Sequence, residues 1–223
     1  MKHSRYSLAL LAAAAVALFA PSVVVRAGQS APAIDAFNAA FSKVTSYTFK
    51  LHSHETKGSS VQQRVYDYSF MKPHFAKTLI ESGDGKGSGG VWTGGEKVSG
   101  HQGGFLSGIH LKVDLHDERA TSLRGYTIPD GLPQNIVANY ANIPGTLTQA
   151  AGGKIDGAGT DVLTLVVTNP AGNGGISKQV LYLSQETHWP LREILYEGST
   201  PVLDQSFTDY NLNANLTQDD FPF

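Results

Sequence analysis

Apolar residues recur along this chain with two different periods, and the first is helical. Four apolar side chains share one face of a helix because they stand three or four residues apart: Ile34, Phe37, Phe41 and Val44. We expect an amphipathic helix over residues 30–44, with Ser30 as its cap and with Pro32 and Asp35 in its first turn. Its apolar face requires a partner surface to bury against.

The period then changes to two, which is typical of half-buried strands. Every second residue belongs to the buried face in three successive runs: Tyr47, Phe49 and Leu51; Tyr66, Tyr68 and Phe70; Ala76, Thr78 and Ile80. Gly58, Ser59 and Ser60 are turn residues between the first two runs. We therefore expect an antiparallel meander in this part of the chain.

A glycine-rich stretch follows from Gly83 to Gly108, with Val91 and Trp92 and the turn Thr93–Gly95 inside it. One interpretation is a set of hairpin tips and bulges. The other is a mobile lip over a cavity. The stretch does not open a helix and lacks the Lys-Ser/Thr ending of a phosphate-binding loop, so the sequence does not predict a phosphate loop.

The second half of the chain returns to strands after one more short helix. Pro133 suits the first turn of a helix over 130–140, in which Leu132, Ile136 and Tyr140 stand four residues apart. Turn residues then separate the strand-like runs: the residues after Gly145, then 161–169, 176–184 and 191–197, with 202–211 last. We find no internal repeat and no dividing linker, so we expect one α+β domain over residues 28–223, an antiparallel sheet with two helices on one side.

The first 27 residues are typical of a secretory signal peptide and not of the fold. A basic start with Lys2 and Arg5 precedes an apolar run from Leu8 to Ala20, and Val25–Ala27 offers the small residues of a cleavage site. The alternative, an uncleaved membrane anchor, needs roughly 20 continuous apolar residues, and this run is shorter. We expect cleavage after Ala27 and a periplasmic or secreted protein.

Composition narrows the function classes further. The chain has no cysteine, which excludes a lipid-anchored cysteine, disulfides, thiolate metal sites and a cysteine nucleophile. Without the leader, 14 basic residues face 19 acidic ones, a net charge of −5. No Lys/Arg cluster opposes this balance, so we expect no nucleic-acid partner and no binding to anionic membrane surfaces.

Three segments carry a resemblance to a known family. The first is the helix that runs into Tyr47–Phe49, and the second is Met71–Pro73 before the strand from Phe75, followed by Val91–Val98. The third is the closing series Val180–Leu183, Trp189–Arg192, Tyr196–Gly198, Phe207–Asn213 and Asp220–Phe223. In this order the chain resembles the LolA/LolB-like superfamily of periplasmic lipoprotein carriers and its RseB- and LppX-like relatives.

The resemblance implies a curved antiparallel β-sheet that forms an unclosed half-barrel, with helices covering its concave face. It further implies a hydrophobic cavity for an acyl chain, whose burial stabilises by roughly 0.8 kcal/mol per CH₂ group. The candidate cavity-lining residues are Phe37, Phe41, Phe49, Leu51, Tyr68, Phe70 and Trp92. The alternative for each of them is that it fills a solid core.

Lys72 is the candidate polar residue of the lid or cavity. It stands where LolA-like carriers often have an arginine before a proline, a residue that helps to hold the lid. Lysine cannot form the same planar, bidentate set of hydrogen bonds. This departure, with the long glycine-rich stretch, favours a relative with another lipid cargo or a sensor domain.

Other chemistry finds little support in the sequence. His52 and His54 face one side of a strand near Glu55, and His110, Asp114, His116 and Asp117 form a second cluster, but neither has a known metal-ligand spacing. There is no Gly-x-Ser-x-Gly elbow. We therefore expect no enzyme, no metal and no cofactor, although a hydrolase or metal protein that uses the histidines stays as a third hypothesis.

The first hypothesis is a monomeric carrier that holds a lipid or the acyl chain of a lipoprotein in its cavity. The second is an RseB-like sensor or interaction module of the cell envelope, which recognises exported proteins or lipids. Both place the protein in the periplasm or outside the cell, and they differ in whether the main partner is a lipid or an envelope protein.

Overall fold

The structure is a computed structural model that describes residues 23–24, 31–104 and 108–222. Most of the expected leader, residues 1–27, lies outside the described residues, and so does Ser30, the expected helix cap. The leader and its cleavage therefore stay predictions.

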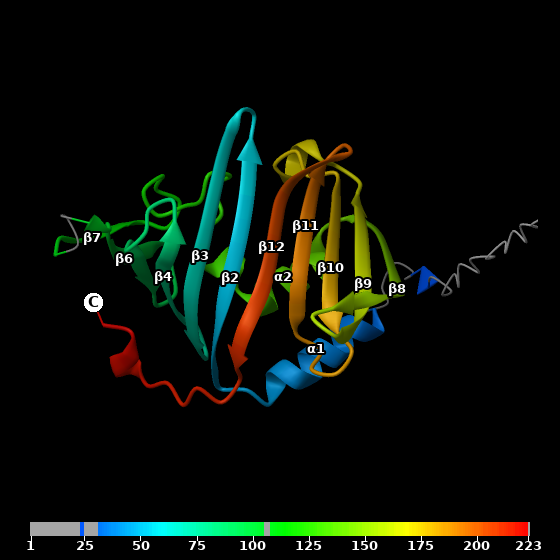
Figure 1. Cartoon of the computed structure of the whole chain (residues 1–223), viewed down its shortest axis with the longest axis horizontal. Coiled ribbons are helices and arrows are strands. Elements are labelled where there is room, and N and C mark those ends of the chain that lie inside the picture. The colour runs from blue at the N-terminus through cyan, green and yellow to red at the C-terminus, as the bar shows by residue number, and fades with distance from the viewer. Residues whose placement is uncertain (1–22, 25–30, 105–107, 223) are drawn as a thin grey trace, which may run out of the picture.

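One twelve-stranded antiparallel sheet and two α-helices make up most of the described chain (Figure 1). The helices are α1 (Pro32–Ser42) and α2 (Pro133–Asn142). The first seven strands are β1 (Val23–Val24), β2 (Ser46–Lys57), β3 (Ser60–Met71), β4 (Phe75–Gly83), β5 (Gly89–Trp92), β6 (Lys97–His101) and β7 (His110–Asp114). The others are β8 (Gly145–Ile155), β9 (Ala158–Val167), β10 (Lys178–Ser184), β11 (Pro190–Glu197) and β12 (Thr200–Asn211). Single-turn 3₁₀ helices are η2 (Pro129–Gly131), η3 (Ala171–Asn173) and η4 (Gln218–Asp220).

The order of the strands explains why one segment lies across the sheet. The sheet runs β1-β8-β9-β10-β11-β12-β2-β3-β4-β5-β6-β7, so two meanders meet where β12 pairs with β2. The chain leaves β7 at one edge and re-enters near the other edge at β8. Residues 115–144 connect these edges, and they do so over the concave face. We call residues 115–132, the part before α2, the crossing segment.

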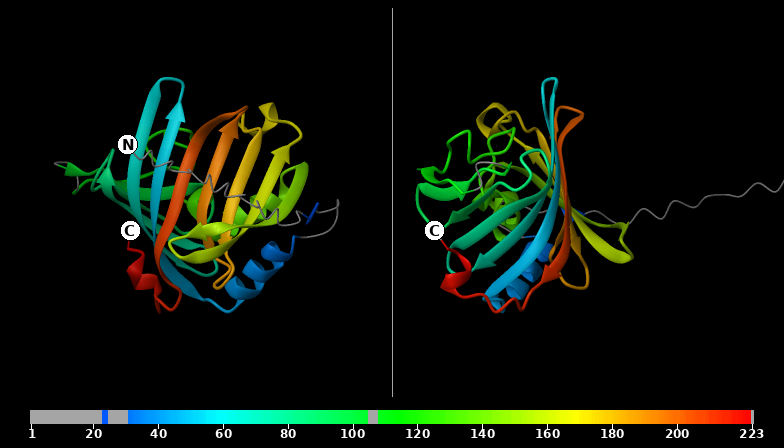
Figure 2. Two further views of the ribbon diagram at one scale, coloured as in Figure 1. Left: turned by 45° about the vertical axis from the view of Figure 1, so that its right-hand side comes forward. Right: turned by 60° about the vertical axis from the view of Figure 1, so that its left-hand side comes forward.

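The sheet is strongly curved but not closed, because β7 at one edge and β1 and β8 at the other do not pair with each other. Figure 2 shows it curving around the crossing segment and α2, drawn in green. The expected α+β half-barrel, with helices on the concave face, is therefore confirmed. Strand alternation produces this arrangement, since one face of each strand meets the core and the other meets water.

Helix α1 begins later than expected. Its N-cap is Ala31, which offers no side-chain hydrogen bond, while Pro32 and Asp35 do lie in the first turn. Pro32 has no N–H to satisfy, which reduces the need for a polar cap. No helix in the described ranges is long and apolar enough to cross a membrane.

A cluster of aromatic rings, packed mainly edge to face or tilted, fills one end of the half-barrel, where α1 packs on the sheet. Ring centroids lie 5.4 Å apart for Phe37 and Trp189, 4.9 Å for Tyr47 and Trp189, and 5.0 Å for Tyr47 and Phe70. Phe37, Tyr47 and Trp189 are buried. This end of the concave face is a solid core.

The glycine-rich stretch holds regular structure instead of only hairpin tips. It contains β5 and β6, and Gly90 pairs directly with Gly100 across them. A Cβ on Gly90 would lie 3.0 Å from Cδ1 of Ile128 in the crossing segment. A larger side chain at position 90 would therefore have to displace the Ile128 side chain, because the crossing segment packs against this strand.

Candidate functional site

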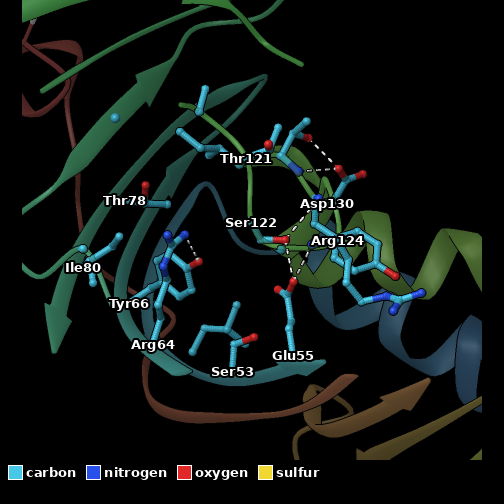
Figure 3. A pocket seen from close by; sticks show the side chains of 18 of the residues that line it. Ser53, Glu55, Arg64, Tyr66, Thr78, Ile80, Thr121, Ser122, Arg124 and Asp130 are labelled. Atoms are coloured by element: carbon cyan, nitrogen blue, oxygen red, sulfur yellow. Dashed lines mark hydrogen bonds between the residues drawn. The ribbon is translucent and has the colours of Figure 1, made fainter. Parts of the chain in front are cut away.

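A cavity of about 1030 Å³ lies at the other end of the concave face, between the sheet and the crossing segment (Figure 3). Strands from both meanders, the crossing segment, α2 and the loop between β9 and β10 contribute to its wall. Small-molecule sites measure roughly 300–1,000 Å³. The cavity therefore has room for a ligand at the large end of that range.

Much of the wall is apolar. Leu51, Ile80, Val98, Ile128, Ile136 and Leu195 line the cavity and are buried. At its rim, Ile109 and Leu111 are 53% and 46% exposed beside the edge strand β7. Exposed side chains of this size at a cavity mouth are typical of a surface that meets apolar matter.

Polar contacts fasten the crossing segment to the tip of the β2–β3 hairpin. The buried carboxylate of Glu55 accepts hydrogen bonds from the Ser122 hydroxyl (2.8 Å) and the Arg124 backbone N–H (3.0 Å) (Figure 3). The Arg124 side chain donates to the Thr56 carbonyl oxygen (2.7 Å) and pairs with Glu197. These bonds give the buried carboxylate its partners, which its burial requires.

At its C-terminal end, the crossing segment packs directly against the sheet. A Cβ on Gly131 would lie 2.3 Å from the hydroxyl oxygen of Tyr68. Only glycine allows this approach, so Gly131 sets how closely the crossing segment and α2 sit over Tyr68. Burial raises the pKa of the Tyr68 hydroxyl well above its usual value.

A row of polar side chains crosses the floor of the cavity at right angles to the strands. Strand register places Glu193 opposite Gln205, Gln205 opposite Ser53, and Ser53 opposite Arg64. All four line the cavity. We call Glu193, Gln205, Ser53 and Arg64 the polar row. It runs from a buried carboxyl on β11 to a partly exposed guanidinium on β3.

At the buried end of the polar row, the carboxyl group of Glu193 has no cationic partner among the described residues. Glu193 is 4% exposed, and one of its oxygens accepts a hydrogen bond of 2.6 Å from the Gln205 amide. Burial raises the pKa of Glu193 to about 7, and no cation in the described part of the chain pairs with it. The buried Tyr140 hydroxyl lies close enough to Glu193 to lower its pKa as a hydrogen-bond donor does, although its geometry falls short of a regular hydrogen bond.

The outer end of the row is a guanidinium with spare donors. Arg64 donates from Nε to the Asp84 carbonyl oxygen (2.8 Å) and from Nη1 to the Tyr66 hydroxyl (3.1 Å). No carboxylate in the described ranges pairs with it. Figure 3 shows Arg64 and Tyr66 together on the sheet side of the pocket.

The structure separates the seven candidate cavity residues into two groups. Leu51 and Tyr68 line the cavity. The others lie outside its wall: Phe37, Phe41, Phe49, Phe70 and Trp92. All five belong to the hydrophobic core or pack against it, and the Trp92 indole also donates to the Gly95 carbonyl oxygen (2.8 Å). A ligand-binding role stays a prediction for the seven residues.

Lys72 lies at the C-terminus of α1, away from the cavity wall. Its ammonium donates to the carbonyl oxygens of Phe41 (2.8 Å) and Ser42 (3.4 Å) and lies 4.2 Å from the centroid of the Phe41 ring. A cation at this end of a helix satisfies free carbonyls and complements the helix dipole. Lys72 thus ties α1 to the end of β3.

The histidines do not converge with acids on one site. His52 and His54 are both on the convex face, where they contact Thr208 (3.2 Å) and Gln63 (3.0 Å), whereas Glu55 faces the cavity. In the second cluster, Asp114 pairs with Lys97 and Asp117 with Arg119. No group of three or more metal-ligating side chains forms within the residues that the structure describes.

Sequence reasoning missed the polar row and the bonds of the crossing segment. The signal for Glu193 was its place between Leu191 and Leu195, since period two puts all three on one face. Glu55 likewise continues the inward series of Phe49, Leu51 and Ser53. Nothing local in the sequence indicates that Ser122 and Arg124 meet Glu55.

Comparison with known proteins supports the fold. No protein-family model matches the chain, and no curated protein sequence matches it. Among solved structures, it is similar to an uncharacterised conserved protein from Thermus thermophilus (TM-score 0.55, 10% identity, covering 85% of this chain and 90% of the other). It is also similar to MucB (0.52, 16%, 87% and 63%) and to the lipoprotein LppX of Mycobacterium tuberculosis (0.51, 14%, 83% and 96%).

At these identities the likeness concerns the fold alone. The expected fold is confirmed as one that MucB and LppX share, and this chain covers 63% of the MucB chain. The open half-barrel with helices on its concave face thus belongs to an architecture that MucB and LppX share.

Proposed function

We propose that the protein is an exported, monomeric binding protein that holds the acyl chain of a lipid or lipoprotein in the cavity under the crossing segment. The observation that carries this proposal is the cavity of about 1030 Å³ with its apolar wall and its apolar rim at Ile109 and Leu111. Each buried CH₂ group of a ligand contributes roughly 0.8 kcal/mol. Binding of this kind needs no bond chemistry, no metal and no cofactor.

The resemblance of the sequence to periplasmic lipoprotein carriers supports the same proposal, and LppX, which shares the fold, is itself a lipoprotein. The contacts of Glu55 with Ser122 and Arg124 hold the segment closed, so they take the place in this chain of a latch at Lys72.

The test is a binding titration of the full chain with undecanoic acid that carries a fluorescent dansyl group. Ser53→Trp places a large side chain inside the cavity, and His52→Trp places the same side chain on the convex face as a matched control. We expect the wild type and His52→Trp to bind alike and Ser53→Trp to lose at least about tenfold in affinity, since steric filling removes the ligand's contacts. A wild type that does not bind the probe, or a Ser53→Trp variant that binds as well as the wild type, contradicts the proposal.

A second candidate is a sensor that binds an envelope protein. The shared fold with MucB and the exposed Ile109 and Leu111 at an edge strand favour it, because an unpaired edge can accept a strand of another chain. Stable capture of a protein partner by a chain that excludes the dansyl probe would favour this candidate over the carrier.

A further inference from the structure

The polar row is an unusual floor for a cavity that holds only hydrocarbon. A lipid-binding cavity needs few polar groups, and those present fix the position of the ligand. Burying an ionisable carboxyl costs several kcal/mol unless it is paired. Glu193 is buried in this way within the sheet. A leucine at this position, like its neighbour Leu195, would fit the alternation of the strand equally well.

The groups that face Glu193 leave it short of donors. From β12 it receives the Gln205 amide, from α2 the nearby Tyr140 hydroxyl, whose geometry falls short of a regular hydrogen bond, and from the crossing segment an electrostatic interaction with the Tyr126 hydroxyl. Two arginines of the neighbouring chain segments each have another carboxylate as their partner. Arg192 points to the other face of β11 and pairs with Asp204, and Arg124 pairs with Glu197.

Resting on the proposed function, we propose that Glu193 is an internal recognition group, and that the natural ligand is an amphiphile whose hydrogen-bond donor, an ammonium or a hydroxyl, binds this carboxyl inside the cavity. The acyl chain then lies among Leu51, Ile80 and Val98 on the side of β2 to β6. The polar group is thus held within the sheet and not left in water at the rim.

Charge and hydrogen bonding favour a donor over an anion. An ionised carboxylate only accepts hydrogen bonds, so a ligand carboxylate at this position meets repulsion and offers no donor. An ammonium supplies both a donor and the missing charge. Since burial raises the pKa of Glu193 to about 7, the carboxyl is mostly ionised at about pH 8, and this preference is strongest there.

The test compares three probes of equal chain length on the full chain at about pH 8, where a primary amine is still charged. Tetradecylamine, tetradecan-1-ol and tetradecanoic acid each displace the bound dansyl-undecanoic acid. We expect the amine to bind at least about tenfold more tightly than the acid, with the alcohol between them, because hydrogen bonds to charged groups contribute roughly 1.5–3 kcal/mol.

Glu193→Gln removes the charge with little change of shape, and Glu186→Gln removes one charge at an exposed turn as the matched control. We expect Glu193→Gln to lose the preference for the amine while it keeps its affinity for the alcohol within a few fold, and Glu186→Gln to behave as the wild type. Retained affinity for the alcohol also shows that Glu193→Gln is folded.

The outcomes separate this inference from the proposed function. Equal affinity for the three probes, or an amine preference that persists in Glu193→Gln, overturns the role of Glu193 and leaves the carrier intact. Failure of all three probes to displace dansyl-undecanoic acid overturns both, and so does failure of that probe to bind at about pH 5, where Glu193 is protonated and does not repel its carboxylate.

Discussion

At the scale of single residues, the alternation of strands determines which side chains face inward, but not what they meet there. Leu51 and Phe49 are two residues apart on β2 and share a face, yet Leu51 lines the cavity and Phe49 packs in the aromatic core. The difference arises from segments distant in sequence. Helix α1 fills one end of the half-barrel with aromatic rings, and the crossing segment leaves the other end hollow.

For this reason the inward direction of Leu51 and Tyr68 could be predicted from the sequence, whereas the boundary between core and cavity could not. The inward direction of the Glu193 side chain could also have been predicted, because Leu191 and Leu195 share its face of the strand. Its lack of a cation depends on where Arg192 and Arg124 find their partners, which is a property of the tertiary structure.

Glu193 also makes the stability of the protein depend on pH in a definite direction. Its pKa is about 7 in the folded state against 4.5 without burial, so the folded protein holds this proton more tightly. The free energy of unfolding therefore falls as pH rises from about 4.5 to about 7, by about 3 kcal/mol from this group. Below that window the burial of the neutral acid carries no such penalty.

We predict that Glu193→Gln removes this part of the pH dependence. Urea unfolding of the wild type and the variant at about pH 5 and about pH 8 measures it, and the stability of the variant relative to the wild type is expected to rise by about 2–3 kcal/mol between the two. A difference that stays constant with pH would show that Glu193 titrates normally in the folded protein.

At the scale of elements, the connection between the two meanders, which consists of the crossing segment and α2, completes the wall of the cavity. Most strands and both helices could be predicted, since their periods are clear over several turns or alternations. Strands β5 and β6 could not, because glycine has a low strand propensity, and because the packing of Ile128 over Gly90 comes from a segment distant in the sequence.

We predict that Gly131→Ala pushes the crossing segment away from the sheet, because the added Cβ overlaps the Tyr68 hydroxyl. Overpacking of this kind costs about 1–3 kcal/mol of stability. The control Gly153→Ala, on β8, has no heavy atom within 4 Å of the added Cβ and should change stability by no more than about 0.5 kcal/mol.

Chemical unfolding of both glycine variants measures these effects. A second substitution, Tyr68→Phe, removes the nearest clashing atom and should restore part of the stability that Gly131→Ala loses. If Gly131→Ala is as stable as Gly153→Ala, the close contact between the crossing segment and Tyr68 is not a constraint on the fold.

At the scale of the whole molecule, stability and ligand binding belong to opposite ends of the concave face. Phe37 lies in the aromatic core and outside the cavity wall. We predict that Phe37→Ala costs about 3–5 kcal/mol of stability and leaves the affinity for dansyl-undecanoic acid within about twofold, measured well below the unfolding temperature.

The matched change at the other end is Leu51→Ala, which removes apolar surface from the cavity wall as well as from the core. It should lower both the stability and the affinity for the probe. Loss of affinity in Phe37→Ala without loss of fold would instead place the acyl chain against α1, as the sequence pattern first suggested.

The open edges of the sheet have a consequence for the size of ligand that the protein can hold. In a closed barrel, the number of strands and their stagger fix the radius, so the interior cannot widen without breaking ladder hydrogen bonds. Here β7 and β8 do not pair, and the two meanders meet only along β12 and β2. Bending along that seam widens or narrows the space above it with every ladder bond kept. An open sheet of this kind can therefore hold ligands of different width without losing the ladder hydrogen bonds that stabilise it.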